Sequence, residues 1–284
     1  MKSIAGLELS ELEFSNIRKL VLENTGISLS GSKKELVKRR FTPRLKALGL
    51  GSFASYVKHM KHNHAVEVAN FCNAITTNLT SFFRENHHFE FMKDEVLPAI
   101  LERNDSIGRK LRLWSAGCST GQEAYCLAMN ITSFIPAIDR WDVKILASDL
   151  DEKCLDIARR GIYAHEGFDK MSDDLITRYF VEVEQENVRK DQIFLQARPE
   201  LRQMIRFNKL NLVNSYWPMK GMFDVIFCRN VFIYFDKDTQ LKLVKRFSAI
   251  QTPGSYLFLG HSETIADPQT VGYRLMGKTL YIRE

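Results

Sequence analysis

The stretch LRLWSAGCSTGQEAYCLAM at residues 111–129 decides the fold of this chain. An apolar run ends in a turn that contains Gly117 and Gly121, and a helix-like segment rich in small residues follows at once. This order is typical of a strand, a nucleotide-binding loop and a helix start. The pattern recurs in DVKILASDLDEKCLDIA at 142–158, where Asp149 ends the second apolar run. Together the two units predict an α/β domain that binds an adenosine-containing cofactor.

Apolar runs and helical stretches continue to alternate through residues 81–284. Such alternation predicts a sheet of mostly parallel strands flanked by helices, with ligands bound outside the carboxyl ends of the strands. Residues 161–202 interrupt it with a polar helix candidate and a short β-like piece, which indicates an inserted subdomain. We expect strands at 111–115, 143–148, 203–209, 223–228, 255–260 and 279–283, and helices at 121–134, 151–160 and 236–250.

Residues 1–80 show helical periodicity and no strand alternation. The first predicted helix has Ser10 as its N-cap and Gly26 as its stop signal. The second, at 34–49, contains Pro43, which we expect to kink or divide it. Two shorter helices are expected at 52–61 and 65–75, so that a small all-helical domain at 1–80 precedes the α/β domain at 81–284.

Composition places the chain among ordinary globular proteins, since its 284 residues are 45% hydrophobic and 26% charged. No apolar run has the length of a membrane span, and the first residues lack the apolar core of a signal peptide. The five cysteines form no CxxC pair, which argues against a disulfide framework or a zinc site. These features predict a cytoplasmic protein without membrane insertion and without a bound metal.

The net charge of +6 lies in the first 80 residues, which hold 12 Lys and Arg against 6 Asp and Glu. Its densest part is KKELVKRRFTPRLK at 33–46, with seven bases and one acid. A charge run of this kind is usually a solvated helix face, and the alternative is a docking face for an acidic partner. Because the α/β domain is neutral and the basic segment holds few aromatic residues, an acidic protein surface is favoured over nucleic acid.

The loop AGCSTGQE at 116–123 departs from a strict GxGxxG, which makes it a poor fit for the pyrophosphate of NAD or FAD. S-adenosylmethionine has no phosphate, so a loop that binds it needs fewer glycines. The alternative for this loop is a plain turn between a strand and a helix. Asp149 is placed to accept hydrogen bonds from both ribose hydroxyls, or else to cap the next helix. Asp151 could take that cap and free Asp149 for ribose.

Two further segments place polar side chains near the predicted binding edge. FDVIFCRNVFIYFDKDTQ at 223–240 has Asn230 and Tyr234 after an apolar strand, and a helix cap at Asp236 explains neither of them. NAITTNLTSFFRENHHF at 73–89 joins the two domains and is either a linker with helix caps or a lid over the cofactor. Its adjacent His87 and His88 lack metal-ligand spacing, so that surface or packing roles are expected for both.

Taken together, these segments resemble the chemotaxis receptor glutamate methyltransferases, the CheR family. The resemblance covers nearly the whole chain and implies a Rossmann-like, S-adenosylmethionine-dependent methyltransferase domain with a seven-stranded sheet. It also implies the N-terminal helical domain and a small inserted β-subdomain. The motifs that carry it are ITTNLTSFFRE (75–85), LWSAGCSTGQEAY (113–125), ILASDLD (145–151), FDVIFCRNVFIYFD (223–236) and LFLGHSE (257–263).

The resemblance also implies a set of cofactor-binding residues. Glu123 and Asp149 would bind the amino and ribose groups, and the loop keeps Glu123 although it departs from the family pattern around it. Residues of the linker would close over the cofactor, others would flank the adenine, and a last pair would follow the next strand. These are Asn78, Thr80 and Arg84 of the linker, Asn211 and Leu212 beside the adenine, and Arg229 and Asn230 after the strand.

The implied reaction moves a methyl group from S-adenosylmethionine to a glutamate oxygen of a chemotaxis receptor. The products are a methyl ester and S-adenosylhomocysteine. A glutamate has a pKa of about 4.3 and is already ionised at neutral pH, so no general base is needed. The enzyme must instead align the oxygen, the methyl carbon and the sulfur. Arg84 and Tyr234 are the candidates for holding the acceptor carboxylate.

Receptor methylation helices carry several carboxylates, which basic residues of the second predicted helix could recruit. Some family members also grip a receptor tail peptide through a glycine-containing turn in the subdomain. The corresponding stretch at 181–194 contains no glycine, which argues against tail-peptide binding. A methyltransferase for another acceptor, and an adaptor that binds cofactor without turnover, remain the alternatives. The basic residues proposed for docking are Lys38, Arg39, Arg40, Arg44 and Lys46.

Overall fold

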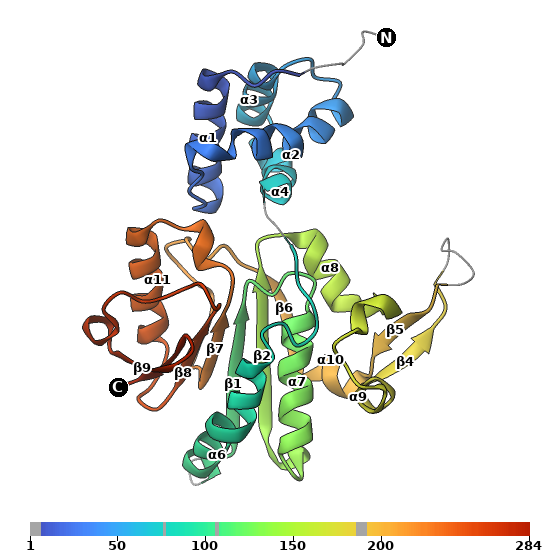
Figure 1. Ribbon diagram of the computed structural model, residues 1–284, viewed down its shortest axis with the longest axis vertical. Coiled ribbons are helices and arrows are strands. Elements are labelled where there is room, and N and C mark those ends of the chain that lie inside the picture. The colour runs from blue at the N-terminus through green and yellow to red at the C-terminus, as the bar shows by residue number, and fades with distance from the viewer. Residues whose placement is uncertain (1–6, 76–77, 106–107, 186–191) are drawn as a thin grey trace. The chain divides into compact units, whose positions relative to one another are not determined.

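A computed structural model describes residues 7–75, 78–105, 108–185 and 192–284. Their contacts divide the chain into two compact units (Figure 1). The helical unit comprises Met1–Thr77 and Tyr234–Thr239, and the sheet unit comprises Asn78–Ile233 and Gln240–Glu284. Among the described helices, none has the length and apolar character needed to cross a membrane.

The helical unit is built from four described α-helices, and the first of them begins and ends at the predicted signals. The Ser10 side chain accepts the backbone N–H of Glu13, and the Glu13 carboxylate accepts the backbone N–H of Ser10 at 2.9 Å. This reciprocal pair is a capping box, and Gly26 ends the helix in the left-handed conformation. Both predicted helix signals are therefore confirmed. The helices are α1 (Glu11–Thr25), α2 (Lys34–Ala47), α3 (Phe53–His62) and α4 (His64–Ile75).

We expected Pro43 to kink or divide this helix, and α2 continues through Pro43 to Ala47 without being divided. Phe41 and Leu45 on either side of the proline are fully buried in the core of the unit. The Phe41 ring lies 5.1 Å from the ring of Phe71 in α4. This packing holds both halves of the helix, and Pro43 removes only one backbone donor near the helix end.

A buried carboxylate ties α2, α3 and α4 together. Glu67 is 1% exposed and accepts hydrogen bonds from Arg44 Nε at 2.8 Å and from the Tyr56 hydroxyl at 2.9 Å. Burial alone would raise the pKa of Glu67, but the hydrogen bonds from Arg44 and Tyr56 outweigh it and lower the pKa below its ordinary value. Arg44 therefore has a structural partner within its own unit.

The sheet unit contains, within its described residues, a seven-stranded sheet in the order β6-β2-β1-β7-β8-β10-β9. The first five strands in this order pair in parallel, and β10 is antiparallel to both of its neighbours. Strands were found at all six predicted places. They are β1 (Lys110–Ala116), β2 (Asp142–Asp149), β6 (Ile205–Lys209), β7 (Val225–Cys228), β8 (Tyr256–Leu259), β9 (Tyr273–Gly277) and β10 (Leu280–Arg283).

Helices cover both faces of this sheet because successive strand residues point to opposite sides. Leu113 of β1 packs in a buried cluster with Leu127 of α7, whereas the ring of Trp114 lies 5.4 Å from that of Phe247 in α11. The helices of this unit are α5 (His87–Phe91), α6 (Leu97–Asp105), α7 (Gln122–Phe134), α8 (Glu152–Arg160), α9 (Asp173–Tyr179), α10 (Pro199–Met204) and α11 (Lys237–Ala249), with a π-helical turn at Met92–Val96 between α5 and α6. The first turn of α11, at 237–239, is grouped with the helical unit.

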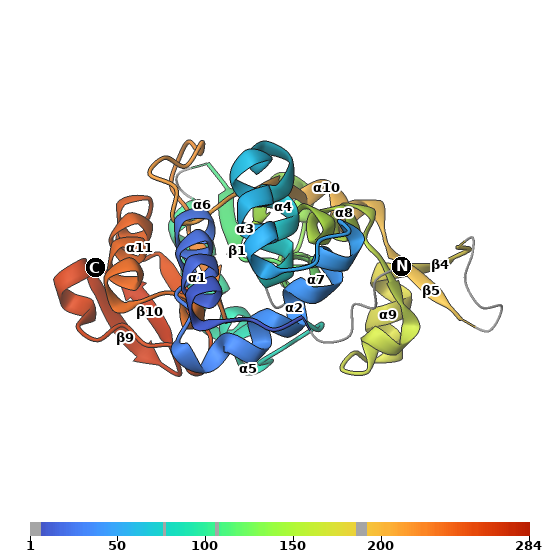
Figure 2. The same cartoon turned by 90° about the horizontal axis from the view of Figure 1, so that it is seen from above.

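The inserted segment forms a small antiparallel sheet in the order β3-β5-β4, which confirms the predicted β-subdomain. Its strands are β3 (Ile162–Ala164), β4 (Phe180–Val183) and β5 (Phe194–Ala197). This small sheet lies at the opposite end of the unit from β9 and β10 (Figures 1 and 2). Residues 186–191, in the stretch that we compared with the family's peptide-gripping turn, lie outside the described residues.

Candidate functional site

The strand order reverses at β1, because the chain fills β2 and β6 on one side of it and β7 and β8 on the other. The loops that follow these parallel strands meet at one edge of the sheet. In open α/β sheets this edge, at the point of reversal, is where ligands bind. The predicted site residues of the sheet unit follow these strands or lie in the segment before α5.

The loop after β1 depends on two glycines. Gly117 and Gly121 have φ angles of 89° and 98°, in the left-handed region. A Cβ atom on Gly117 would lie 2.4 Å from Val231, and one on Gly121 would lie 2.7 Å from the Cβ of Ala158. The backbone N–H of Gly117 also donates to the carbonyl of Ser148 at 2.8 Å, which fixes the loop on β2. Only glycine allows both this backbone and this close packing.

Asp149 ends β2 and leaves the helix cap to its neighbour, as predicted. Asp151 caps α8 by accepting the backbone N–H of Lys153 at 2.9 Å. One oxygen of Asp149 accepts the N–H of Ser119 at 2.7 Å, and the other accepts the N–H of Asp151 at 2.9 Å. Burial raises the pKa of Asp149, and these backbone hydrogen bonds oppose the rise. Each oxygen keeps further acceptor capacity, which suits two hydroxyl donors.

The segment that precedes α5 is held at the same edge. The side-chain amide of Asn78 donates to Asp151 at 2.8 Å, and the backbone carbonyl of Asn78 accepts the hydroxyl of Ser119 at 3.1 Å. Thr80 and Arg84 are half-buried, and Nη1 of Arg84 donates to the carbonyl of Leu79 at 2.8 Å. Asn78 is therefore brought next to the loops after β1 and β2.

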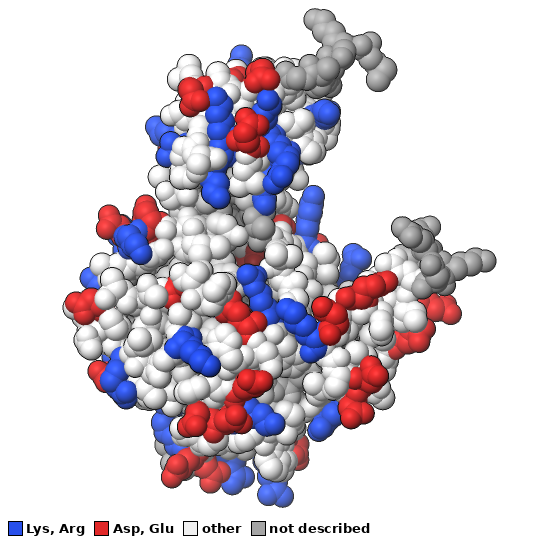
Figure 3. Space-filling model, viewed as in Figure 1, with Lys and Arg blue, Asp and Glu red and all other residues white. Residues whose placement is uncertain are grey.

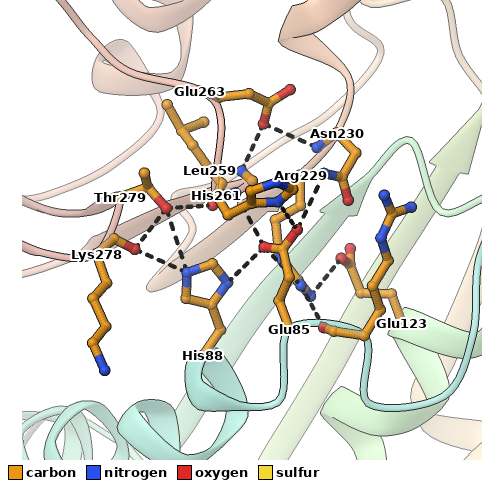
Figure 4. Close-up of polar contacts among 12 residues, drawn as sticks. Glu85, His88, Glu123, Arg229, Asn230, Leu259, His261, Glu263, Lys278 and Thr279 are labelled. Atoms are coloured by element: carbon orange, nitrogen blue, oxygen red, sulfur yellow. Dashed lines mark hydrogen bonds and ion pairs between the residues drawn. The ribbon is translucent and has the colours of Figure 1, made fainter.

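A buried arginine after β7 connects this segment with α7 (Figure 4). Arg229 is 5% exposed, and its guanidinium lies 3.3 Å from Glu123 and 3.2 Å from Glu85. The same guanidinium donates to the carbonyl of Arg84 and lies over the ring of Phe89, 5.5 Å from its centre. The positive charge of Arg229 is thus balanced by two carboxylates of the protein itself.

Glu123, in the first turn of α7, is oriented by two donors. The hydroxyl of Ser115 donates to one of its oxygens at 2.7 Å, and Arg229 approaches the other. Burial raises the pKa of Glu123, while the charge of Arg229 and the hydrogen bond from Ser115 oppose the rise. The Glu123 side chain keeps 14% of its surface exposed.

Asn230 joins the loops after β7 and β8. It has a φ angle of 60°, and its backbone N–H donates to Glu263 at 2.9 Å. Glu263 is 3% exposed and also accepts the backbone N–H of Gly260 at 2.6 Å. Burial raises the pKa of Glu263, and the hydrogen bonds from the backbone oppose the rise. This carboxylate therefore holds the backbone on which Asn230 sits.

Asn211 and Leu212 follow β6 and lie close to Asp149 along the sheet edge. The backbone N–H of Leu210, directly before them, donates to the carbonyl of Asp149 at 2.9 Å. The side chain of Asn211 accepts the N–H of Val213 at 3.1 Å, and Leu212 is 7% exposed. The structure thus brings this predicted pair beside the predicted ribose-binding acid.

Tyr234 is a predicted site residue that does not belong to the sheet unit. It belongs to the helical unit, where its carbonyl accepts the N–H of Ser28 at 2.8 Å. Its half-buried side chain packs against the apolar core of that unit. The catalytic role that we assigned to Tyr234 stays a prediction.

Sequence reasoning missed Glu85 and Glu263, although both lie in motifs that it singled out. The available signal was an acid in each motif: one directly after Arg84, and one just past the apolar run of β8. His88 has the packing role that we expected, since it is 1% exposed and its Nε2 donates to the carbonyl of Lys278 at 3.0 Å. Within the described ranges, no cluster of three or more His, Cys, Asp or Glu residues is arranged to hold a metal.

Comparison with known families decides between the possible cofactors. Residues 78–282 match the family described as "CheR methyltransferase, SAM binding domain", and residues 12–76 match "CheR methyltransferase, all-alpha domain". The chain belongs to the CheR methyltransferase family. Our predictions of the CheR family, of a methyltransferase fold and of S-adenosylmethionine as cofactor are therefore confirmed.

Several relatives of this CheR-family chain match over nearly their whole length. Chemotaxis protein methyltransferase 2 of Pseudomonas aeruginosa is 40% identical, over 95% of this chain and 92% of that protein. The chemotaxis protein methyltransferase of Escherichia coli K12 is 37% identical, over 97% and 92%. That of Borreliella burgdorferi is 35% identical, over 94% and 93%.

We predict that protonation of His88 weakens the sheet unit as the pH falls from about 6.5 to 4. Burial lowers the pKa of His88 from 6.5 to about 4, so the unfolded chain binds a proton that the fold rejects. Stability from this group is complete above pH 6.5 and falls by at most about 1.4 kcal/mol per pH unit within that window. Urea unfolding followed by tryptophan fluorescence reports this unit, because Trp114, Trp141 and Trp217 all belong to it.

The variant His88→Gln should flatten the stability profile between pH 6.5 and 4.5, whereas His165→Gln, at an exposed histidine, should keep the wild-type profile. Protonation of Glu85 does not change the stability between pH 6.5 and 4.5. Its pKa is lowered to about 2, so its contribution is lost only as the pH falls below about 4.5. An unchanged slope in His88→Gln would show that another group causes the acid sensitivity.

Proposed function

We propose that this protein transfers the methyl group of S-adenosylmethionine to glutamate side chains of chemotaxis receptors. The products are glutamate methyl esters and S-adenosylhomocysteine. The observation that carries the proposal is the pair of half-buried carboxylates, Glu123 and Asp149, fixed at the point of strand reversal in a CheR-family chain. The relatives' names, which are those of chemotaxis protein methyltransferases, support a receptor as the acceptor.

The donor set at the sheet edge fits the parts of S-adenosylmethionine. Asp149 has acceptor capacity on both oxygens for the ribose hydroxyls, and Glu123 offers a fixed carboxylate to the ammonium group. Asn78, held beside Asp149 through Asp151, would cover the cofactor from the linker. The remaining contacts are assigned to Thr80 and Arg84 of the same segment, to Asn211 and Leu212 at the adenine, and to Arg229 and Asn230 after β7.

The bound cofactor supplies an electrophilic methyl group on a sulfonium. The acceptor carboxylate is already ionised, so the protein's task is to align it and to exclude water. Arg84 is suited to this, because its guanidinium carries five N–H donors and the structure shows Nη1 donating to the carbonyl of Leu79. We assign Arg84, with Tyr234 as a second candidate, to holding the acceptor. We place the reaction in the cytoplasm, which suits a chain whose five cysteines are all buried.

The ribose assignment predicts a loss of cofactor affinity in Asp149→Asn. The amide replaces one of two acceptor oxygens and removes the charge, so the Kd for S-adenosylhomocysteine should rise at least tenfold, or about 1.4 kcal/mol. Titration calorimetry measures this directly. The control Asp156→Asn removes an exposed acid of α8 that pairs with Arg159, and it should leave the Kd unchanged. Equal affinities in the two variants would remove Asp149 from the site.

The reaction itself predicts transfer of tritiated methyl groups to receptor membranes, with release of tritiated methanol in alkali. Base-stable label would contradict a carboxyl ester.

Arg84→Ala should lower turnover at least tenfold by losing alignment of the acceptor. Turnover and the Kd for S-adenosylhomocysteine should be measured separately, with the exposed Arg140→Ala as control. Unchanged turnover would remove Arg84 from the catalytic residues.

The basic segment of α2 is our proposed docking face for receptor helices. On the face drawn in Figure 3, Lys and Arg side chains gather over the helical unit with a few acids among them. Several of these charges have partners within the unit: Lys38 pairs with Glu8 at 3.1 Å, Arg44 pairs with Glu67, and Arg40 donates to the carbonyl of Ile75 at 3.1 Å. The docking proposal therefore depends chiefly on the two remaining residues, Arg39 and Lys46.

Arg39 and Lys46 are exposed, and neither has a charged partner in the part of the chain that the structure describes. They are seven residues apart on α2 and therefore share one helix face. Two unpaired cations on one face suit an acidic helix of a receptor. Attraction of this kind is screened by salt.

The double variant Arg39→Glu/Lys46→Glu should raise the KM for receptor at least threefold and weaken its dependence on ionic strength, with kcat retained. The control Lys58→Glu/Lys61→Glu makes the same change of charge at exposed positions of α3 and should have little effect. Initial rates of methyl transfer at 50 and 300 mM salt provide the comparison. A KM that responds equally in both double variants would point to net charge instead of this face.

A further inference from the structure

Two motif residues, Glu85 and His261, have no part in the proposed function, yet they meet at the sheet edge (Figure 4). The carboxylate of Glu85 is held from the loops after both β7 and β8. It lies 3.2 Å from the guanidinium of Arg229 and accepts the Asn230 amide at 3.2 Å. From His261 it accepts Nδ1–H at 2.8 Å and the backbone N–H at 3.2 Å.

This carboxylate is well suited to a fixed role. Only 11% of the Glu85 side chain is exposed. Burial alone would raise its pKa, but the hydrogen bond from His261 and the charge of Arg229 lower the pKa to about 2. Glu85 is therefore ionised at neutral pH.

The backbone around Arg84 is strained. Phe83 and Glu85, on either side of Arg84, have φ angles of 48° and 54°, in the left-handed region that residues with a side chain rarely adopt. The Cβ of such a residue crowds the following carbonyl oxygen, so surrounding contacts must hold this conformation. The contacts of the Glu85 carboxylate and the hydrogen bond from Arg229 to the Arg84 carbonyl supply that restraint.

We infer that Glu85 is a positioning residue, which His261 and Arg229 hold in place so that the strained turn presents Arg84 to the acceptor carboxylate. The inference rests on the role proposed for Arg84 above. Arg229 is the link, because one guanidinium binds both the Glu85 carboxylate and the Arg84 carbonyl. His261 closes the arrangement from the outside, since 66% of its side chain is exposed while Nδ1 faces Glu85.

A double-mutant cycle between Glu85 and Arg84 tests this inference. Glu85→Gln should lower kcat/KM for receptor methylation at least tenfold, since a small misplacement of an aligning group is costly. In the Arg84→Ala background the same change should lower it by less than twofold, because the group that Glu85 positions is gone. The control Glu90→Gln, at an exposed acid in the same region that bonds only locally to Asn86, should leave the rate unchanged.

His261 provides a second arm that does not depend on a buried charge. His261→Ala should lower kcat/KM three- to tenfold, and His261→Asn should restore most of the loss because its amide N–H replaces Nδ1–H. Loss of the imidazole bulk alone would give equal rates in the two variants and would overturn the role of His261. The exposed His165→Ala is the matched control.

The outcomes separate this inference from the proposed function. Additive effects of Glu85→Gln and Arg84→Ala, with melting temperatures lowered in parallel, would show a general structural role and overturn the inference. Normal turnover in Arg84→Ala would instead overturn the catalytic role of Arg84. Absence of base-labile methyl transfer by the wild type would overturn the reaction. Should Glu85→Gln fail to fold, the comparison of His261→Ala with His261→Asn decides the question.

Discussion

The site depends on the ion pairs and the hydrogen bond that the buried guanidinium of Arg229 makes. The guanidinium stands between the carboxylates of Glu85 and Glu123, and it also binds the carbonyl of Arg84. A single buried cation beside two anions is favourable only when each group is fixed and hydrogen-bonded, because desolvation of the charges is costly. Arg229 thereby joins its own loop after β7 to the segment before α5 and to the start of α7. Glu85 in turn joins these segments to the loop after β8 through His261.

The acids at the sheet edge have two different roles. Glu85 and Glu263 face inward and hold backbone, whereas Glu123 and Asp149 keep part of their acceptor capacity for a ligand. The inward acids receive backbone or charged donors from neighbouring loops. Both oxygens of Glu123 and of Asp149 also accept a hydrogen bond from the protein, which fixes each carboxylate and still leaves its oxygens acceptor capacity for a ligand.

Local signals in the sequence predicted the fold and part of the site. The capping residues Ser10 and Asp151 were readable because a cap involves neighbours within three residues. The strands of the parallel core were readable from their apolar runs, but β9 was not, since its exposed residues at 274–277 lack a buried face. The pairing of Glu85 with Arg229 was also hidden, because it joins positions far apart along the chain. Distance along the chain, more than the kind of residue, limited the prediction.

The assignment of Tyr234–Thr239 to the helical unit has a consequence for the covalent architecture. The backbone passes between the two units three times, after residues 77, 233 and 239, and not once through a single hinge. A fragment ending at residue 77 would lack six residues of its own unit. The complementary fragment would carry these six residues, the last three of them as the first turn of α11. The two units are therefore not consecutive stretches of the sequence. Truncation at one point of the chain does not remove the helical unit intact.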